Sequence, residues 1–204
     1  QEFFSGTDSE VVLNAYRHWG PDCLTRFRGM FAFAVLDRDP ASGPKLFLAR
    51  DRFGIKPLIY SLNRNGFVFS SELGALLNSG LIERKISLKA LGQYCRMGSI
   101  LQPDTIYENV HHLQPGTYIM VSGHNDINRV RWYDVRRESL RLSVQYAHKD
   151  YPELVEITKA KLEDATKWHT IADVEVGSFL SGGLDSSAVT GLMKRYLNTK
   201  IKTF

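Results

Sequence analysis

The stretch that decides the fold of this chain reads Phe179-Leu180-Ser181-Gly182-Gly183-Leu184-Asp185-Ser186-Ser187. An apolar run over 174–180 leads into the two glycines, and a helical pattern covers 185–197. A second apolar run follows at 201–204. Strand, glycine turn, helix and strand in this order predict a parallel βαβ unit, with a first strand of the buried type.

The two glycines are suited to binding phosphate groups. Because they lack a Cβ, the backbone N–H groups can approach a ligand, and the helix that follows adds unsatisfied donors and the positive end of its dipole. Three hydroxyl groups add donors, from Ser181, Ser186 and Ser187. Asp185 would repel phosphate, so it is better suited to hold a Mg²⁺ ion that bridges phosphate oxygens. The stretch therefore predicts a pyrophosphate site with Mg²⁺ at Asp185.

The pattern differs from two common nucleotide-binding loops. It lacks the Gly-Lys-Ser/Thr end of a Walker loop and the third glycine of the dinucleotide fingerprint. It resembles the PP-loop of the ATP pyrophosphatase group, Ser-Gly-Gly-x-Asp-Ser-Ser. This resemblance implies cleavage of ATP between the α and β phosphates, which gives an adenylated substrate. It also implies that Phe179 and Leu180 touch the adenosine part of ATP, and that the pyrophosphate and Mg²⁺ are held by Ser181, Gly182, Gly183, Asp185, Ser186 and Ser187.

The composition is that of a folded protein with one large or two small domains, since 43% of the 204 residues are hydrophobic and 24% are charged. The net charge is +4, but Lys and Arg are scattered, so we expect no nucleic-acid partner. No run approaches the roughly 18 apolar residues of a membrane helix, so we expect no membrane association. Cys23 and Cys95 are too few for a disulfide framework, and we expect two buried, reduced thiols in a cytoplasmic protein.

Apolar spacing in the N-terminal part predicts an antiparallel sheet with helices against it. Asn65-Gly66 predicts a hairpin, and Ser87 is expected to cap a helix over 87–97. Thr7 or Asp8 is expected to cap a helix over 8–19. The other expected elements are helices near 22–28, 72–77 and 152–168, and strands over 30–36, 45–49, 58–62, 67–70, 117–121 and 131–135.

Four further stretches join the PP-loop in resembling one family. They are Gly29 to Ala34, Arg50 to Leu58, Phe69 to Leu77, and Thr105 to Glu108 with Leu113 to Gly116. In this order, the stretches resemble those of glutamine-hydrolysing asparagine synthetases, over nearly the whole chain. The resemblance implies an α+β part followed by an α/β part: the C-terminal part of an N-terminal-nucleophile αββα sandwich, then the first βαβ unit of a PP-loop (adenine nucleotide alpha hydrolase-like) synthetase domain.

The same resemblance implies a domain order and a reaction. We expect a partial class II glutamine amidotransferase domain over 1–122, a connecting region over 123–150, and the start of the ATP-dependent synthetase domain over 151–204. The implied enzyme is a ligase that hydrolyses glutamine for ammonia and adenylates the aspartate side chain with ATP. Its products are asparagine, glutamate, AMP and pyrophosphate. The implied partners are these small molecules and, for the full-length protein, a second copy in a homodimer.

The resemblance also implies a role for Asp8, while the charged residues near Phe53-Gly54 are interpreted from their own positions in the sequence. Asp8 matches the acid that binds the α-amino group of substrate glutamine, although sequence alone favours a helix cap there. The charged residues of the second stretch are expected to form an ion-pair network that holds a turn: Arg50, Asp51, Arg52 and Lys56.

The chain departs from the family at its start. The family's nucleophile is an N-terminal cysteine, whereas Gln1 stands first here, and neither Cys23 nor Cys95 has the free α-amine that serves as base. We therefore expect an internal fragment without a glutaminase nucleophile, inactive by itself in both reactions. The alternatives are a relative with another acceptor, of the β-lactam-forming or polysaccharide-cluster type, or an inactive nucleotide-binding fragment.

Overall fold

A computed structural model describes residues 3–41, 43–123, 126–197 and 200–204. Gln1 and residues 124–125 of the expected connecting region lie outside the described residues. The chain contains both helices and strands and divides into two compact units, Gln1–Glu138 and Ser139–Phe204. Each unit is described by itself.

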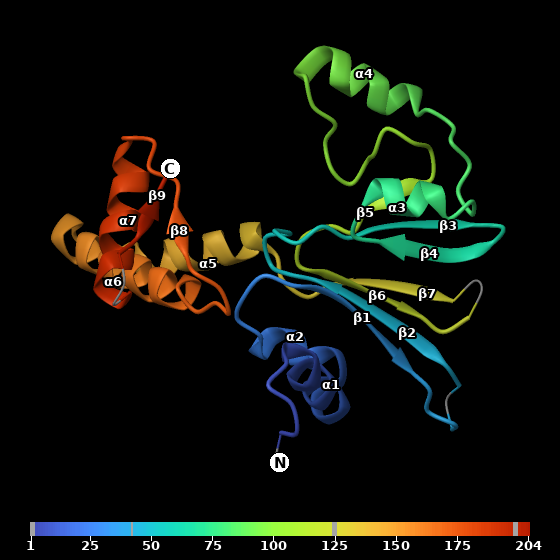
Figure 1. Ribbon diagram of the computed structural model, residues 1–204, viewed down its shortest axis with the longest axis horizontal. Coiled ribbons are helices and arrows are strands. Elements are labelled where there is room, and N and C mark those ends of the chain that lie inside the picture. The colour runs from blue at the N-terminus through green and yellow to red at the C-terminus, as the bar shows by residue number, and fades with distance from the viewer. Residues whose placement is uncertain (1–2, 42, 124–125, 198–199) are drawn as a thin grey trace. The chain divides into compact units, whose positions relative to one another are not determined.

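The first unit contains two antiparallel sheets (Figure 1). One has the strand order β1-β2-β6-β7 and the other β4-β3-β5. The strands are β1 (Ala32–Asp37), β2 (Lys45–Arg50), β3 (Ile59–Asn63), β4 (Gly66–Ser70), β5 (Val110–His112), β6 (Thr117–Val121) and β7 (Ile127–Arg131). The helices of this part are α1 (Asp8–Trp19), the short 3-10 turn Gly20–Asp22, α2 (Cys23–Arg26), α3 (Leu73–Asn78) and α4 (Leu88–Met97), and α5 (Val135–Tyr146) begins at its end.

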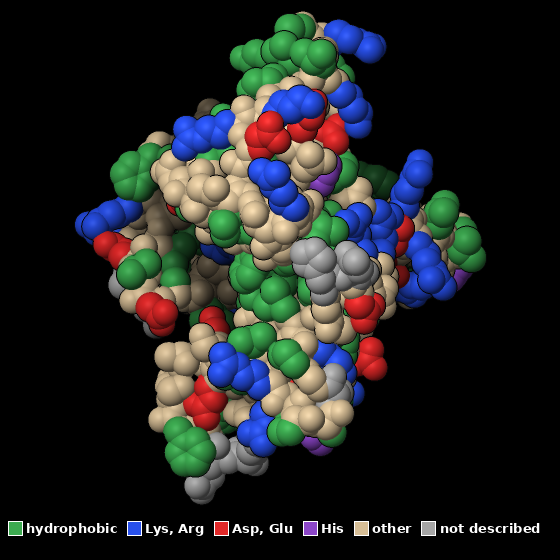
Figure 2. Space-filling view, turned by 90° about the vertical axis from the view of Figure 1, so that its right-hand side faces the viewer, with side chains coloured by type: hydrophobic (Ala, Val, Ile, Leu, Met, Phe, Trp, Pro, Cys, Tyr) green, Lys and Arg blue, Asp and Glu red, His purple; other side chains and the backbone are tan. Residues whose placement is uncertain are grey.

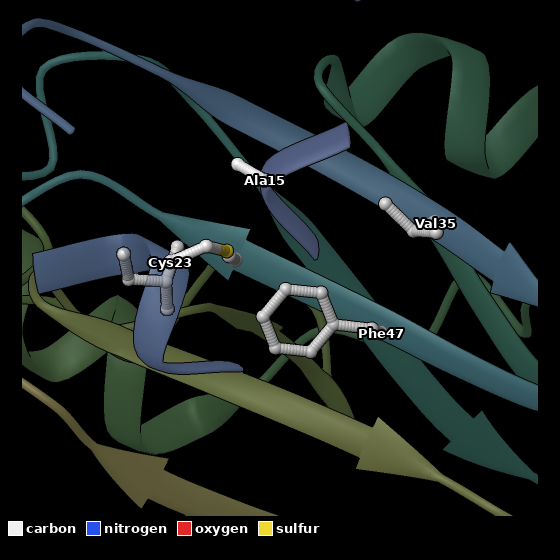
Figure 3. Packing of buried hydrophobic residues seen from close by; sticks show 6 residues of the cluster. Ala15, Cys23, Val35 and Phe47 are labelled. Atoms are coloured by element: carbon white, nitrogen blue, oxygen red, sulfur yellow. The ribbon is translucent and has the colours of Figure 1, made fainter. Parts of the chain in front are cut away.

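Alternation along β2 places this strand between two layers. Phe47 and Ala49 pack in one cluster with α1 and α2, which includes Ala15 and Cys23 (Figure 3). Leu48 points the other way, into a cluster with residues of the second sheet. Successive side chains of a strand lie on opposite faces, so one strand serves both layers. The helices therefore cover one face of the four-stranded sheet, and the three-stranded sheet covers the other.

The second sheet uses the same alternation. Leu58 and Tyr60 pack toward Leu48, whereas Ile59 packs with Leu76 of α3 and with residues around it. The order of layers in this unit is thus helices, sheet, sheet, helix (Figure 1).

The hairpin between β3 and β4 is confirmed, with its turn one residue earlier than expected. Asn63 pairs with Gly66, so Arg64 and Asn65 form the turn. Gly66 opens β4 at φ +112°, a conformation that favours glycine.

Helix α4 begins as expected but buries little of its surface. The Ser87 side chain accepts a hydrogen bond from the Ala90 N–H at 3.2 Å, which confirms the cap. Ala90 is fully buried, whereas Leu88 is 78% exposed. The exposed apolar side chains of α4 form the green area at the top of Figure 2. Cys95 is also exposed, so the expectation of two buried cysteines holds only for Cys23.

The expected strand over 131–135 is wrong. The strand ends at Arg131, and α5 begins at Val135 because the Asp134 carboxylate accepts hydrogen bonds from the N–H groups of Arg136 and Arg137, at 2.9 and 3.2 Å. The helix was not predicted, because four polar residues separate Val135 from Leu140 and hide the apolar spacing of its first turn. The polar stretch 123–150 thus contains β7 and α5, while the domain bounds themselves stay a prediction.

The second unit contains a parallel βαβ arrangement, as predicted. β8 (Gly177–Ser178) pairs in parallel with β9 (Lys202–Thr203), and α7 (Leu184–Tyr196) connects them. Helix α6 (Tyr151–His169) precedes them and begins with a capping box, in which Asp150 and Glu153 each accept from the other's backbone N–H.

The first strand of this unit is much shorter than expected and is not buried. Only Gly177 and Ser178 pair, and Val174 is 78% exposed. Two strands of two residues each present too little surface for a helix to cover.

No helix within the described ranges is long and apolar enough to cross a membrane.

Replacing Leu48 with Ala should lower the free energy of unfolding by about 2–5 kcal/mol, because a fully buried leucine between the sheets leaves a cavity. Leu62 is 45% exposed on β3, and Leu62→Ala should cost less than about 1 kcal/mol. Urea denaturation followed by circular dichroism measures both. Equal losses for the two variants would contradict the two-sheet core.

Candidate functional sites

The glycine-rich loop of the second unit has the geometry of an open helix start. Gly182 adopts φ +80° with no other heavy atom within 4 Å of the position a Cβ would take. Gly183 is the N-cap residue of α7, and no side chain caps this end. The N–H groups of the first helical turn are therefore available to a ligand.

Serine hydroxyls shape the same loop. The oxygens of Ser181 and Ser186 lie 3.1 Å apart, and the Ser186 hydroxyl donates to the Gly183 carbonyl at 3.1 Å. The Ser187 N–H donates to Gly183 as the first helical hydrogen bond of α7. The loop thus brings together the predicted serines and glycines around one helix end.

The strand end beside the loop is held by the last residue of the chain. The Phe204 N–H donates to the Ser178 carbonyl at 3.1 Å, and Leu180 donates back to Phe204 at 2.8 Å. The ring centroids of Phe179 and Phe204 lie 6.2 Å apart, and Phe179 is 84% exposed. An exposed aromatic ring at this place offers a surface on which a planar base can stack.

Asp185 lies in the first turn of α7, with its side chain exposed. A carboxylate oxygen at this place is a suitable Mg²⁺ ligand. The described residues hold no group of three or more His, Cys, Asp or Glu that could bind a metal alone.

A second candidate site lies in the first unit, in a cavity of about 430 Å³. Asp8 and Val12 of α1 line it, together with Phe31 and Ala32 at the start of β1 and Lys56 in the loop after β2. Asp8 is the first helical residue, and Thr7 occupies the N-cap position without a side-chain hydrogen bond. The carboxylate of Asp8 is therefore not used as a cap.

Glu10 anchors the segment that leads to Asp8, a role that the sequence did not reveal. Its carboxylate accepts from the N–H groups of Phe4 and Ser5, at 2.8 and 2.6 Å, and from the Ser5 hydroxyl at 2.7 Å. These hydrogen bonds, first of all the one from Phe4, lower the pKa of the Glu10 carboxyl.

The Asp51 carboxylate, which lies near the cavity, is buried at 1% exposure and densely hydrogen-bonded. It accepts from four backbone N–H groups: those of Phe31 at 3.3 Å, Phe53 at 3.1 Å, Ile55 at 3.0 Å and Lys56 at 3.0 Å. We call residues 51–57 and the bonds made by the side chains of Arg50 and Asp51 the Asp51 clamp.

Arg50 is the positively charged residue of the clamp, and it too bonds mainly to main-chain groups. Its guanidinium donates to the carbonyls of Lys56 at 2.8 Å, Gly54 at 2.7 Å and Leu113, and to the Gln102 side chain at 3.0 Å. Burial lowers the pKa of Arg50, while the nearby Asp51 charge opposes this shift. The expected turn is held, but mainly by hydrogen bonds from the charged side chains to main-chain groups rather than by an ion-pair network. The pattern of charges in a sequence does not distinguish these two uses.

Arg52 extends the contacts toward α2. It donates to the carbonyls of Phe27 at 2.5 Å and Thr25 at 3.1 Å, and its guanidinium lies 5.1 Å from the ring centre of Trp132.

Neither cysteine is placed as a nucleophile. Cys23 is fully buried, and burial raises the pKa of its thiol to about 11, so it stays protonated at neutral pH. Cys95 lies on the exposed side of α4 and does not line the Asp8 cavity.

Each of the two sites lies in a part of the chain that matches a known family. A family model described as a glutamine amidotransferase domain matches residues 1–133. The chain belongs to this family. A second model, described as asparagine synthase, matches residues 158–204. This amidotransferase chain thus carries the Asp8 cavity in the first match and the glycine-rich loop in the second.

Curated relatives match along nearly the whole chain. It is 35% identical over 98% of its length to putative glutamine-hydrolysing asparagine synthetase 2 of Methanocaldococcus jannaschii, of which it covers 38%. Identity to a putative glutamine-hydrolysing asparagine synthetase of Mycobacterium tuberculosis H37Rv is 37% over 99% of the chain and 30% of that protein. The chain is 32% identical over 94% of its length to glutamine-hydrolysing asparagine synthetase 3 of Bacillus subtilis 168, of which it covers 30%. The chain spans about a third of the length of these relatives, and the resemblance that the motifs predicted is confirmed.

The amidotransferase unit should not tolerate a side chain at Gly116. This residue has φ +61°, and a Cβ would lie 2.3 Å from the Tyr133 carbonyl oxygen. Gly116→Ala should therefore cost about 2–4 kcal/mol of unfolding free energy. The matched variant Gly74→Ala, in α3 with open space around it, should gain about 0.5–1 kcal/mol. Urea denaturation compares the two, and a Gly116→Ala variant as stable as the wild type would contradict the close contact.

Proposed function

We propose that this chain is part of a glutamine-hydrolysing asparagine synthetase, a ligase that uses ATP to convert aspartate to asparagine. The observation that carries the proposal is the glycine-rich loop at the start of α7, within a chain whose first unit matches a glutamine amidotransferase domain. The full-length enzyme would release ammonia from glutamine at one site and use it at the other. Its products would be asparagine, glutamate, AMP and pyrophosphate.

The finer fold assignment belongs to the same proposal. We assign the first unit to the C-terminal part of an N-terminal-nucleophile αββα sandwich, supported by its order of helix, sheet, sheet and helix layers. The second unit would be the first βαβ unit of a PP-loop synthetase domain, supported by the parallel pairing of β8 with β9.

At the ATP site, each predicted group has a separate task. The N–H groups at the start of α7 and the hydroxyls of Ser181, Ser186 and Ser187 would donate to the pyrophosphate oxygens. Asp185 would hold Mg²⁺, which would offset the phosphate charge when bound. Phe179 and Leu180 would contact the adenosine part. A carboxylate is a poor electrophile, so transfer of AMP to the aspartate side chain gives it a leaving group that ammonia can displace.

At the glutamine site, Asp8 would bind the α-ammonium group of the substrate. Its carboxylate lines the cavity and is not consumed as a helix cap. A charge-assisted hydrogen bond to an ammonium group is shorter and stronger than one between neutral groups. Such a contact would orient glutamine for attack by a nucleophile that the family carries at its N-terminus.

Aspartate as acceptor, a cytoplasmic location and a homodimer complete the proposal for the full-length enzyme. The names of the relatives support aspartate, and those relatives are glutamine-hydrolysing asparagine synthetases.

The test of the proposed function is the release of AMP and pyrophosphate by the full-length protein with ATP, Mg²⁺, glutamine and aspartate. Release that requires aspartate supports the proposal. Turnover with another carboxylate but not with aspartate would show that aspartate is not the acceptor. Gly182→Ala should weaken Mg-ATP binding about 5- to 30-fold, since a non-glycine residue at φ +80° costs about 1–2 kcal/mol.

The control for this variant is Gly191→Ala, the same change inside α7, where the added methyl group has open space. It should leave the dissociation constant of Mg-ATP, measured by isothermal titration, within about twofold of the wild type. Equal affinities for Gly182→Ala and the wild type would exclude the loop as the phosphate site.

Asp8→Asn should raise the KM for glutamine about 10- to 100-fold, because a hydrogen bond to a charged group contributes about 1.5–3 kcal/mol. Activity with added ammonia should not change, since ammonia bypasses this site. Asp22→Asn is the matched control, as Asp22 lies in the same unit and does not line the cavity. A glutamine KM that Asp8→Asn leaves unchanged would remove Asp8 from the site.

A further inference from the structure

We propose that Asp51 is a positioning residue of the glutamine site, and that its buried carboxylate holds two walls of the Asp8 cavity in register. This inference rests on the proposed function, because it assigns a task to a residue behind the site that the function requires. Asp51 itself does not line the cavity.

The first step is a shared oxygen. Asp51 Oδ2 accepts from the N–H of Phe31 at 3.3 Å and from the N–H of Lys56 at 3.0 Å. Phe31 and Lys56 both line the Asp8 cavity, yet one precedes β1 and the other follows β2. A single carboxylate oxygen therefore joins two walls that are 25 residues apart in the chain.

The second step is that further hydrogen bonds fix Asp51 both to Phe31 and to the loop that leads to Lys56. The backbone N–H of Asp51 donates to the Phe31 carbonyl at 2.9 Å, so Phe31 and Asp51 are joined twice. The other carboxylate oxygen, Oδ1, accepts from Phe53 and Ile55, which shapes the loop that leads to Lys56. With four donors and 1% exposure, the Asp51 side chain has no space to change rotamer.

The third step concerns the far side of the loop. The Arg50 guanidinium donates to the carbonyls of Gly54 and Lys56, so the loop is held through its N–H groups by Asp51 and through its carbonyls by Arg50. Gly54 has no room for a side chain, since a Cβ would lie 2.8 Å from Pro115 and 3.0 Å from the Arg50 guanidinium carbon. The position of Lys56 and of Pro57 in the cavity wall thus depends on both charged side chains.

These contacts predict an effect on glutamine chemistry beyond an effect on stability. A displacement of about 1 Å in a site can cost about 100-fold in rate. In Asp51→Asn, an amide NH₂ replaces one oxygen and faces backbone N–H groups, so at least one wall must move. We expect kcat/KM for glutamine to fall about 10- to 100-fold in folded full-length protein, while activity with added ammonia stays within about twofold.

Two further variants make the test specific. Asp51→Glu keeps the charge but moves the carboxylate by one methylene, and it should also lower kcat/KM for glutamine, because position and not charge alone is required. Asp134→Asn is the control, since the Asp134 carboxylate also accepts from two backbone N–H groups in this unit but does not line or brace the Asp8 cavity. It should leave kcat/KM for glutamine within about twofold of the wild type.

The outcomes separate the two proposals. If the wild type hydrolyses glutamine and folded Asp51→Asn does so with the same kcat/KM, the positioning role is wrong and the proposed function stands. If circular dichroism shows that Asp51→Asn and Asp51→Glu lose the fold of the unit, Asp51 serves the fold alone and the inference is likewise overturned. A full-length wild type without glutaminase activity would overturn the proposed function and this inference together.

Discussion

The buried Asp51 carboxylate is the contact on which the first unit most depends. It accepts hydrogen bonds from three backbone N–H groups of the loop after β2, which has neither helix nor strand, and from the N–H of Phe31 before β1. This loop connects β2 of one sheet to β3 of the other, and a backbone N–H group shielded from water without a partner costs about 1–3 kcal/mol. Arg50 supplies the matching donors for the carbonyls. The charges of this pair are thus used to complete the hydrogen bonding of the main chain.

The two candidate sites differ in the groups that they offer to a charged ligand. At the start of α7, the donors that the described residues offer are main-chain N–H groups and small hydroxyls. In the Asp8 cavity, one carboxylate stands at the beginning of a helix and the walls are largely apolar. A multiply charged phosphate suits the first arrangement, and an ammonium group on a small substrate suits the second.

Periodicity and local signals predicted much of the fold. The bounds of α1, the cap at Ser87 and the strand over 117–121 follow from apolar spacing and from residue types with one strong preference. The strand expected over 131–135 was wrong because β7 ends at Arg131 and Asp134 accepts hydrogen bonds at the start of α5, a helix whose first turn is too polar for apolar spacing to reveal. The exposure of Cys95 depends on what packs against α4, which is a tertiary property. The motif at 179–187 predicted its residues as a site, which stays a proposal, whereas Glu10 and Asp51 act through contacts with main-chain N–H groups that residue type does not reveal.

The Asp51 clamp also has a consequence for how the unit folds. It joins Phe31, Asp51 and Leu113, which flank strands β1, β2 and β5, and Gln102 in the segment before β5. Contacts between residues so far apart in the chain form only after a large loss of chain entropy, which slows folding. The complete set of contacts in the clamp requires that strands of both sheets have come together. In a chain whose clamp has not formed, the two walls of the Asp8 cavity that Asp51 joins are not held to one another.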